Sequence, residues 1–424
     1  MSASIDEGGL VEEADILICG AGIVGLTMAR ALLAKGADRI VILEKEREVG
    51  RHASGRNSGV LHAGVYYPAD SLKAKLCLRG NRLMKEYCKE KRLPLRETGK
   101  VIVAKHEEEV QTLQKLYRTA LTNGARVELI DERQLAVYEP YASTCRQALR
   151  SHNTAVVDPQ AILNSLVDDL LKTGKVKILT DTSFTCLQGT RVAKTSSGTV
   201  RFGTFINAAG AHSDTIAHCL GLATEFRLLP FKGTYKKLKP EKAFMVKANI
   251  YPVPDLRNPF LGVHFTRGIH DDVYIGPTAI PALGRENYGL FENLNCESIR
   301  ILLDDGLMFL SNEKFRNLAM TEPKKYFARA FFEDAKSLVK DLKPEDLDHC
   351  EKVGIRPQLV NWAKKELVMD FMVLKDQESL HILNAISPAF TSSMAFADYV
   401  VDTYLCGGDV SALGGTHGLT PAIP

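Results

Sequence analysis

The stretch ADILICGAGIVGLTMARALLAKGADRIVILE, residues 14–44, decides the fold of this chain. An apolar run at 15–19 predicts a buried strand, and a second apolar run at 40–43 predicts another. Between them, apolar residues recur at helical spacing as far as Gly36, where a helix is expected to end. This order of elements predicts a βαβ unit, the core of a doubly wound α/β fold.

Three glycines and an acid give this unit its ligand-binding character. In the spacing G-x-G-x-x-G, Gly20 permits a tight turn, Gly22 admits a pyrophosphate and Gly25 lets the helix pack closely on the strand. The helix amino terminus offers N–H groups and the positive end of its dipole to phosphates. Glu44 accepts hydrogen bonds from ribose hydroxyls and repels a 2′-phosphate. The motif therefore predicts FAD or NAD and disfavours NADP.

Length, composition and charge narrow the class of protein. A chain of 424 residues, 45% hydrophobic and 25% charged, is typical of a soluble protein with two closely packed domains. The net charge of +3 gives no indication of nucleic-acid binding. Nine scattered cysteines without metal-ligand spacing predict reduced thiols and no metal. The chain shows neither a membrane-spanning run nor a secretory or mitochondrial leader pattern, so we expect a cytoplasmic protein.

Three further segments contain candidate cofactor contacts. The glycine-rich segment 51–67 suits a loop wrapped around a cofactor. A strand at 204–210 ends in small residues before a helix, as in a return to the nucleotide domain. The loop at 387–393 leads into a late helix, whose amino terminus can hold a second part of the ligand. The cofactor candidates are Gly20, Ala21, Gly22, Gly25, Glu44, Lys45, Arg56, Asn57, Ser58, His62, Ala209, Gly210, Pro388, Thr391, Ser392 and Ser393.

Four stretches together resemble one family. They are RNSGVLHAGVYYPADSLKAKLC (56–77), NIYPVPDLRNPFLGVHFT (249–266), GIRPQLVNW (354–362) and LNAISPAFTSSMAFADYV (383–400). With the glycine motif they make the chain resemble the L-2-hydroxyglutarate dehydrogenases (also called oxidases) of the FAD-dependent glycine/D-amino-acid oxidase superfamily. The resemblance extends over nearly the whole chain, from about residue 15 to about residue 400.

The resemblance implies a fold and an activity. It implies a Rossmann-like FAD-binding domain and a discontinuous α+β substrate domain, with an antiparallel sheet over the flavin ring. We expect the FAD-binding domain at 14–80, 150–225 and 351–405, the substrate domain at 81–149 and 226–350, and disordered tails at 1–13 and 406–424. The implied cofactor is non-covalent FAD. The implied reaction oxidises L-2-hydroxyglutarate to 2-oxoglutarate and passes electrons to a quinone, another acceptor or oxygen.

The expected chemistry removes a hydride from the substrate Cα while a base takes the hydroxyl proton. A histidine suits this role, and both His62 and His264 are candidates, with His264 preferred because it would face the ring from the substrate side. A dicarboxylate substrate also needs cations, for which we select Arg356 and Lys232. Further hydrogen bonds are expected from Tyr66, Tyr67 and Tyr235.

Two positions depart from the family pattern. The chain reads Phe231-Lys232-Gly233-Thr234-Tyr235 where relatives have PFRG, an acid and tyrosine, and Phe390 stands where a small residue is usual. Lysine keeps the charge but lacks the planar fork that binds a carboxylate bidentately, so these positions bear on substrate choice. The lysines at 232–242 also predict a peripheral contact with an anionic membrane, at the inner face of the cell membrane.

Three other functions fit parts of the pattern. An FAD-dependent amino-acid or amine oxidase would share the fold but break a C–N bond. A dinucleotide-binding protein without turnover would need no histidine, tyrosine or cation beside the cofactor loops. An NAD-dependent dehydrogenase would carry no flavin chromophore. The four stretches at 56–77, 249–266, 354–362 and 383–400 favour the 2-hydroxy acid dehydrogenase.

Overall fold

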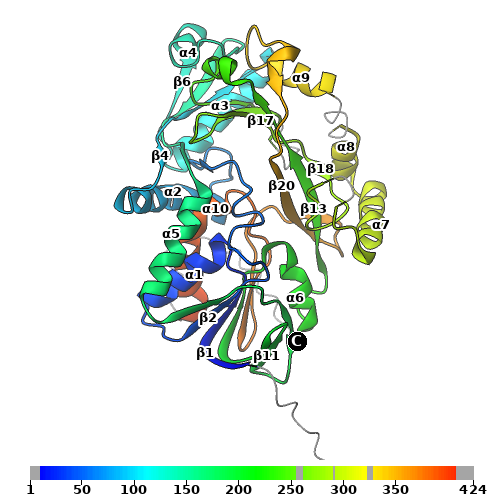
Figure 1. Cartoon of the computed structure of the whole chain (residues 1–424). Helices are drawn as coiled ribbons and strands as arrows, with labels where there is room; N and C mark the ends of the chain where they lie inside the picture. Colours follow the sequence, from blue (N-terminus) through cyan, green and yellow to red (C-terminus); the bar gives the residue numbers. More distant parts are fainter. Residues whose placement is uncertain (1–9, 255–260, 290–291, 322–327, 407–424) are drawn as a thin grey trace, which may run out of the picture.

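A computed structural model of the chain describes residues 10–254, 261–289, 292–321 and 328–406 (Figure 1). The predicted disordered tails lie outside these ranges except at 10–13 and Cys406. Residues 10–13 belong instead to the first strand, which starts at Leu10 and pairs with a later strand from its first residue. No described helix combines the length and the apolar composition needed to cross a membrane.

The lower sheet in Figure 1 contains the predicted βαβ unit. In it, β1 (Leu10–Cys19) lies parallel to β2 (Ile40–Leu43), and α1 (Ile23–Ala34) joins them. The sheet order is β10-β11-β12-β1-β2-β9, with β23 against β12 and β22 against β23. The additional strands are β9 (Val176–Leu179), β10 (Phe184–Leu187), β11 (Val192–Thr195), β12 (Gly198–Asn207), β22 (Val373–Lys375) and β23 (Ser379–Ile382).

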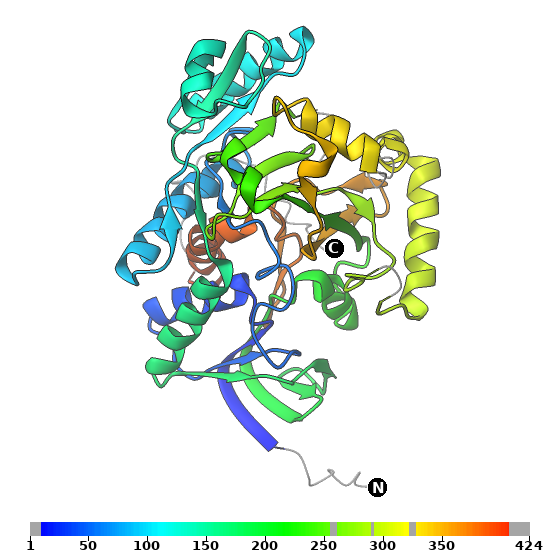
Figure 2. The ribbon, with the colours of Figure 1, turned by 45° about the horizontal axis from the view of Figure 1, so that its top comes forward.

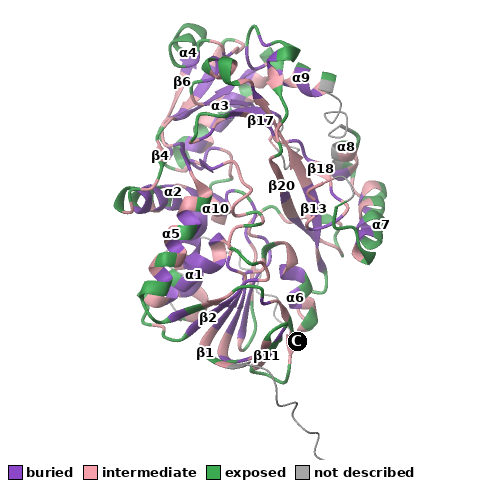
Figure 3. Ribbon diagram, viewed as in Figure 1, coloured by how far each residue is buried: buried purple, intermediate pink, exposed green. Residues whose placement is uncertain are grey.

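Helices cover both faces of this sheet. On one face, α1, α5 (Pro159–Lys172) and α10 (Ala389–Val400) bury one continuous apolar cluster, and Figure 3 shows the inward sides of α1 and α5 buried. On the other face, α6 (Ser213–Cys219) packs through Ile216. The long helix α2 (Leu72–Glu90) lies against α10. Gly80 permits this approach, because a Cβ there would lie 2.4 Å from the Thr391 carbonyl oxygen.

The upper part of the molecule is a second large sheet in the order β19-β14-β17-β16-β15-β5-β7-β6. It is antiparallel except between β5 and β15, and α3 (Glu107–Thr122) and α9 (Ala328–Lys336) contribute side chains to its two cores. The short α4 (Glu132–Tyr138) follows β6. The strands are β5 (Lys100–Val103), β6 (Val127–Asp131), β7 (Gln147–Ser151), β14 (Lys236–Leu238), β15 (Asn249–Pro252), β16 (His264–Arg267), β17 (Val273–Gly276) and β19 (Leu347–Asp348).

A smaller sheet stands between the upper and lower sheets. Its central pair is β13 (Phe226–Thr234) antiparallel to β20 (Val353–Asn361), flanked by β18 (Ile280–Pro281) and β21 (Glu366–Leu367). Outside it lie α7 (Cys296–Ser311) and α8 (Glu313–Thr321), with α7 at the outer edge of Figure 2 in yellow-green. A three-stranded sheet is formed by β3 (Val60–Leu61), β8 (Ala155–Val157) and β4 (Leu95–Arg96).

These sheets confirm the predicted α/β class with a Rossmann-like unit and a second, antiparallel sheet. After β13 and β14 the chain leaves the sheets for a 3-10 helix, Pro240–Met245. Proline has no backbone N–H for a strand ladder and favours the first turn of a helix. The predicted domain boundaries stay a prediction, although β20, placed with the FAD-binding domain, pairs with β13 of the substrate domain.

Candidate functional site

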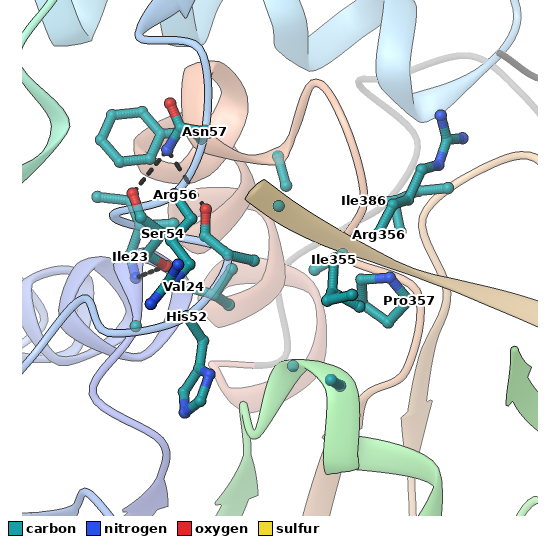
Figure 4. A pocket seen from close by; sticks show the side chains of 18 of the residues that line it. Ile23, Val24, His52, Ser54, Arg56, Asn57, Ile355, Arg356, Pro357 and Ile386 are labelled. Atoms are coloured by element: carbon teal, nitrogen blue, oxygen red, sulfur yellow. Dashed lines mark hydrogen bonds between the residues drawn. The ribbon is translucent and has the colours of Figure 1, made fainter. Parts of the chain in front are cut away.

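A cavity of about 620 Å³ extends from the β1–α1 turn to the small central sheet. This volume is in the range of small-molecule and cofactor sites. Its walls come from distant segments: the glycine turn, the 50–62 loop, residues 208–212, β13, β20 and the start of α10. Figure 4 shows the two sides, with Ile23, Ser54 and Asn57 on one and Ile355, Arg356 and Pro357 on the other.

Each of the three motif positions is occupied by glycine for a different structural reason. Gly20 has a φ of +107°, and a Cβ there would lie 2.5 Å from the Ala208 carbonyl oxygen. At Gly25 a Cβ would lie 1.9 Å from the Gly20 carbonyl oxygen, so only glycine lets α1 sit against the turn. Gly22 lines the cavity, and the first turn of α1 after it is uncharged. A phosphate at this helix terminus would meet N–H groups and no negative side chain.

Glu44 and Ser54 hold the turn in shape. The Glu44 carboxylate accepts hydrogen bonds from the Ala21 N–H at 3.1 Å and the Glu46 N–H at 3.0 Å, and it lines the cavity. Ser54 Oγ accepts from the Ile23 N–H at 2.9 Å, a capping bond supplied from another segment because the N-cap residue Gly22 has no side chain (Figure 4). The predicted acid thus lies in the cavity wall, its contact with a ribose stays a prediction, and the glycine cradle fits an adenine dinucleotide.

A polar cluster borders the same region and joins the predicted residues Lys45 and Arg56 to residues that the sequence analysis did not select. Lys45 pairs with Glu46 and with Glu286 at 2.7 Å, and His52 Nδ1 lies 2.8 Å from the Tyr288 hydroxyl. The Arg56 guanidinium lies over the Tyr288 ring at 4.0 Å. Glu46, His52 and Glu286 could together reach a metal ion, but both carboxylates already form ion pairs with the Lys45 ammonium. This cluster joins the cofactor loops to the 285–288 segment.

The amino terminus of α10 lies at the opposite end of the cofactor loops. Its N-cap is Pro388, and Pro388 and Thr391 line the cavity. Thr391 Oγ1 accepts a hydrogen bond from the His62 N–H at 3.1 Å. This bond ties the loop after β3 to α10. Ser392 and Ser393 are buried in the first turn of the helix and, like Ala21 and Gly25, do not line the cavity; the other cofactor candidates do.

Both predicted histidines line the cavity. His264 Nδ1 lies 2.8 Å from the Gly262 carbonyl oxygen, which can only accept, so Nδ1 carries the proton and Nε2 is left as an acceptor. Its ring stacks on Tyr251 with 3.9 Å between centroids. Burial lowers the pKa of His264 to about 4, with a contribution from the Lys100 charge. Burial, Lys100 and His264 lower the pKa of His62 to about 3.

The predicted cations have different surroundings. Arg356 lines the cavity, and its Nη2 donates to Gln358 Oε1 at 3.2 Å. Removal from bulk water lowers the pKa of Arg356 to about 10, so the guanidinium stays charged at neutral pH. Lys232 does not line the cavity, because its Nζ donates to Asn287 Oδ1 at 2.7 Å and to the Gly289 carbonyl oxygen. The structure thus brings Arg356, but not Lys232, to the cavity wall.

The contacts of the Lys232 side chain account for this difference. Its neighbours Phe231 and Gly233 line the cavity, while the Lys232 ammonium is held by Asn287 and Gly289. Of the three predicted tyrosines, Tyr235 lines the cavity and Tyr66 and Tyr67 lie behind its wall. Sequence reasoning missed the lining residues Ser54, His52, Tyr251, Thr278, Glu286 and Tyr288. For Tyr251, alternation along β15 was the available signal, whereas Thr278 lies between β17 and β18 in a segment whose neighbouring residues also line the cavity.

The chain is similar in sequence to a protein family and to several known proteins. Residues 15–403 match the DAO family, described as FAD dependent oxidoreductase. The chain is 36% identical over 412 residues to the human mitochondrial L-2-hydroxyglutarate dehydrogenase, covering 92% of this chain and 88% of that protein. It is 34% identical over 397 residues to L-2-hydroxyglutarate dehydrogenase of Indibacter alkaliphilus, covering 91% and 98%.

Two solved structures share the fold at low sequence identity. L-α-glycerophosphate oxidase from Mycoplasma pneumoniae, solved with FAD bound, superposes with a TM-score of 0.71 at 21% identity, covering 92% of this chain and 94% of that one. Glycine oxidase from Geobacillus kaustophilus gives 0.69 at 17% identity, covering 96% and 100%. These two similarities concern the fold alone.

Proposed function

The chain belongs to the DAO family of FAD-dependent oxidoreductases, and from this premise we propose that it oxidises L-2-hydroxyglutarate to 2-oxoglutarate. The observation that carries the proposal is the close sequence relationship, over nine-tenths of the chain, to proteins named for that activity in animals and in a bacterium. The cavity supports it because its wall contains both the neutral His264, which can accept a proton, and the charged guanidinium of Arg356.

FAD fits the cavity without a covalent bond. The glycine turn, Glu44 and the α1 terminus would hold the adenosine and diphosphate part, and the α10 terminus would lie toward the flavin part. Bound FAD supplies the two-electron acceptor that takes the hydride from the substrate Cα. The protein's own side chains carry out the remaining steps.

We assign the proton-accepting role to His264. The Gly262 carbonyl fixes the tautomer in which Nε2 has a free lone pair, and the low pKa keeps the ring neutral at working pH. In the reaction Nε2 takes the hydroxyl proton while the Cα–H bond breaks and the C–O bond becomes a carbonyl. His62, also neutral, is held by its backbone to Thr391 and stands as the alternative acceptor. Arg356 binds one substrate carboxylate.

The test uses the purified holoenzyme and its visible spectrum. L-2-Hydroxyglutarate added without oxygen should bleach the flavin absorbance, and the D isomer should not. Glycine, proline and sarcosine are the matched control substrates, because a glycine oxidase shares the fold. A yellow protein bleached by one of these amines, and not by the hydroxy acid, would overturn the substrate. A protein that takes up no FAD would overturn the flavoenzyme assignment.

Variants at two cations separate the carboxylate contacts. Arg356→Met should raise KM for L-2-hydroxyglutarate strongly, whereas Lys232→Met should raise it far less, since Lys232 faces Asn287 and Gly289. Equal effects of the two variants on KM would contradict this assignment.

We further propose that the electrons leave to a quinone at an anionic membrane surface. Of the lysines at 232–242, Lys232 is held by Asn287 and Gly289 and Lys242 pairs with Asp346 at 3.2 Å, so the contact depends on Lys236, Lys237 and Lys239. This places the protein in the cytoplasm, peripherally on the inner face of the membrane. Flotation with anionic vesicles at low and moderate salt tests the contact, and an absence of binding at low salt would refute it.

A further inference from the structure

Lys100 is a buried cation that the proposed reaction does not use. It is the first residue of β5 and is 2% exposed. Its Nζ has no hydrogen-bond partner among the described residues and lies over the rings of Tyr66 at 4.4 Å and Tyr251 at 4.6 Å. A buried ammonium is normally paired with a carboxylate, and here aromatic faces take that place.

One layer of side chains separates Lys100 from the cavity. Tyr251 lines the cavity, lies under the Lys100 ammonium on one side and stacks on His264. The charge of Lys100 also acts on His62 and His264, lowering the pKa of both. Lys100 therefore lies immediately behind the wall against which a substrate would bind.

We infer that Lys100 is a positioning residue for the anionic substrate: from behind Tyr251, His62 and His264 it supplies the positive charge that balances a substrate carboxylate, and it takes up a proton when that anion binds. This inference rests on the proposed function. It adds a second cation to Arg356, and it explains why a lysine without a carboxylate partner is buried at this position.

The electrostatics give the proton uptake a definite pH dependence. Burial lowers the pKa of Lys100 to about 7, so near neutrality the amine is partly uncharged. A carboxylate in the cavity favours the ammonium and raises that pKa. The other titratable groups facing Lys100 are Tyr66, Tyr251, Cys77, His62 and His264, and all are neutral near pH 7 because of burial.

The two histidines cannot reproduce this pattern. With pKa values of about 3 and about 4, they would take up protons mainly as the pH falls toward 5. Uptake by Lys100 has the opposite trend: it is small at pH 6, where the amine is already charged, and large at pH 8. The sign of the trend therefore distinguishes a buried lysine from the two histidines.

Lys73 provides the matched control. It is a second buried lysine, 5% exposed, whose pKa burial and Arg356 lower to about 7. Unlike Lys100, it has a carboxylate neighbour, Asp370. Lys73→Met and Lys100→Met thus each remove one buried lysine whose pKa is lowered to about 7.

The experiment is calorimetric titration of the oxidised holoenzyme with 2-oxoglutarate, a dianion over the whole pH range used. Titrations at pH 6 to 8.5 are run in buffers of different ionisation enthalpy, which gives the number of protons taken up. For a free pKa of about 7 we expect about 0.1 proton per site at pH 6 and about 0.9 at pH 8, with Kd rising nearly tenfold per pH unit above 7.5. Lys100→Met should bind more weakly at pH 6 and lose the uptake and the slope, and Lys73→Met should keep both.

Three results would overturn the inference: no uptake by the wild type at pH 8, uptake that grows toward acid pH, or loss of uptake in Lys73→Met with retention in Lys100→Met. The wild-type titration alone decides the first two, even if Lys100→Met does not fold. If 2-oxoglutarate does not bind the wild-type holoenzyme and L-2-hydroxyglutarate does not bleach it, the proposed function itself fails. Binding without uptake leaves that function intact and removes only the role of Lys100.

Discussion

Replacing Arg285 by methionine should destabilise the protein by an amount that the structure allows us to estimate. Arg285 forms a two-pronged ion pair with Asp214 at 2.5 and 3.1 Å, and the side chains are 2% and 1% exposed. Arg285→Met leaves the Asp214 carboxylate buried without its cation. Breaking a buried pair in this way costs about 3–5 kcal/mol. Asp214 keeps hydrogen bonds from the Leu228 and Thr215 N–H groups, which favours a value of about 3 kcal/mol.

Thermal unfolding of the holoenzyme measures this cost. With an unfolding entropy of about 2.1 cal/mol/K per residue over 424 residues, about 3 kcal/mol lowers Tm by about 3–4 °C. Arg300→Met is the control, because Arg300 pairs with Glu297, as Arg285 does, but its side chain is 48% exposed. That exposed pair contributes less than about 1 kcal/mol. A Tm for Arg285→Met within 1 °C of that of Arg300→Met would refute the reasoning.

The same pair has a predictable pH dependence. Burial alone would raise the pKa of Asp214, but Arg285 and two backbone N–H groups outweigh it and hold that pKa below its ordinary value. The ion pair therefore stabilises the fold fully above the unfolded pKa, near 3.9, and less as the pH falls through the folded pKa. We expect the Tm difference between wild type and Arg285→Met to be largest at pH 7 to 8 and to narrow toward acid pH, because protonation of Asp214 removes the ion pair in the wild type and the uncompensated buried charge in the variant.

The remaining predictions concern the cofactor cradle and the base. His264→Asn should lower kcat by about 10²–10⁴-fold, and on the acid side kcat/KM of the wild type should fall as the pH approaches about 4, because His264 must be neutral to accept a proton. Gly25→Ala, with its Cβ 1.9 Å from a carbonyl oxygen, should yield protein without bound flavin in the visible spectrum, whereas Gly306→Ala, with nothing within 4 Å, should retain it. Ser54→Ala should cost about 1 kcal/mol of stability and raise the Kd for FAD severalfold, measured by flavin fluorescence.

The cofactor half of the site could be predicted because its determinants are local. Gly20, Gly22, Gly25 and Glu44 lie in one continuous stretch whose order fixes the turn, the helix start and the acid. The structure places Gly22 and Glu44 in the cavity wall and uses Gly20 and Gly25 for backbone contacts. Backbone geometry of this kind follows from neighbouring residues, so a single motif was sufficient.

The reacting half depends on contacts between distant residues. Lys232 is held away from the cavity wall by Asn287 and Gly289, 55 and 57 positions further along the chain, so no local pattern shows where its ammonium lies. His52 and Tyr288 are 236 positions apart, and no local pattern indicates that they meet. Lys100 lies in an ordinary apolar strand, and only the positions of Tyr66 and Tyr251 give it a relation to the cavity.

This division explains how proteins with so little sequence in common keep one fold. The cofactor cradle needs glycines and a capped helix, and these constrain the backbone of α1 and its turn. On the reacting side, the fold requires only that some side chains of β13, β16 and β20 point into the cavity. Because side chains alternate along a strand, such a residue can be substituted without moving the strand. Structures named as a glycine oxidase and an L-α-glycerophosphate oxidase share the fold at 17% and 21% identity. Substrate choice in this chain should therefore lie in the inward residues His264, Tyr235 and Arg356, and in the charge behind them.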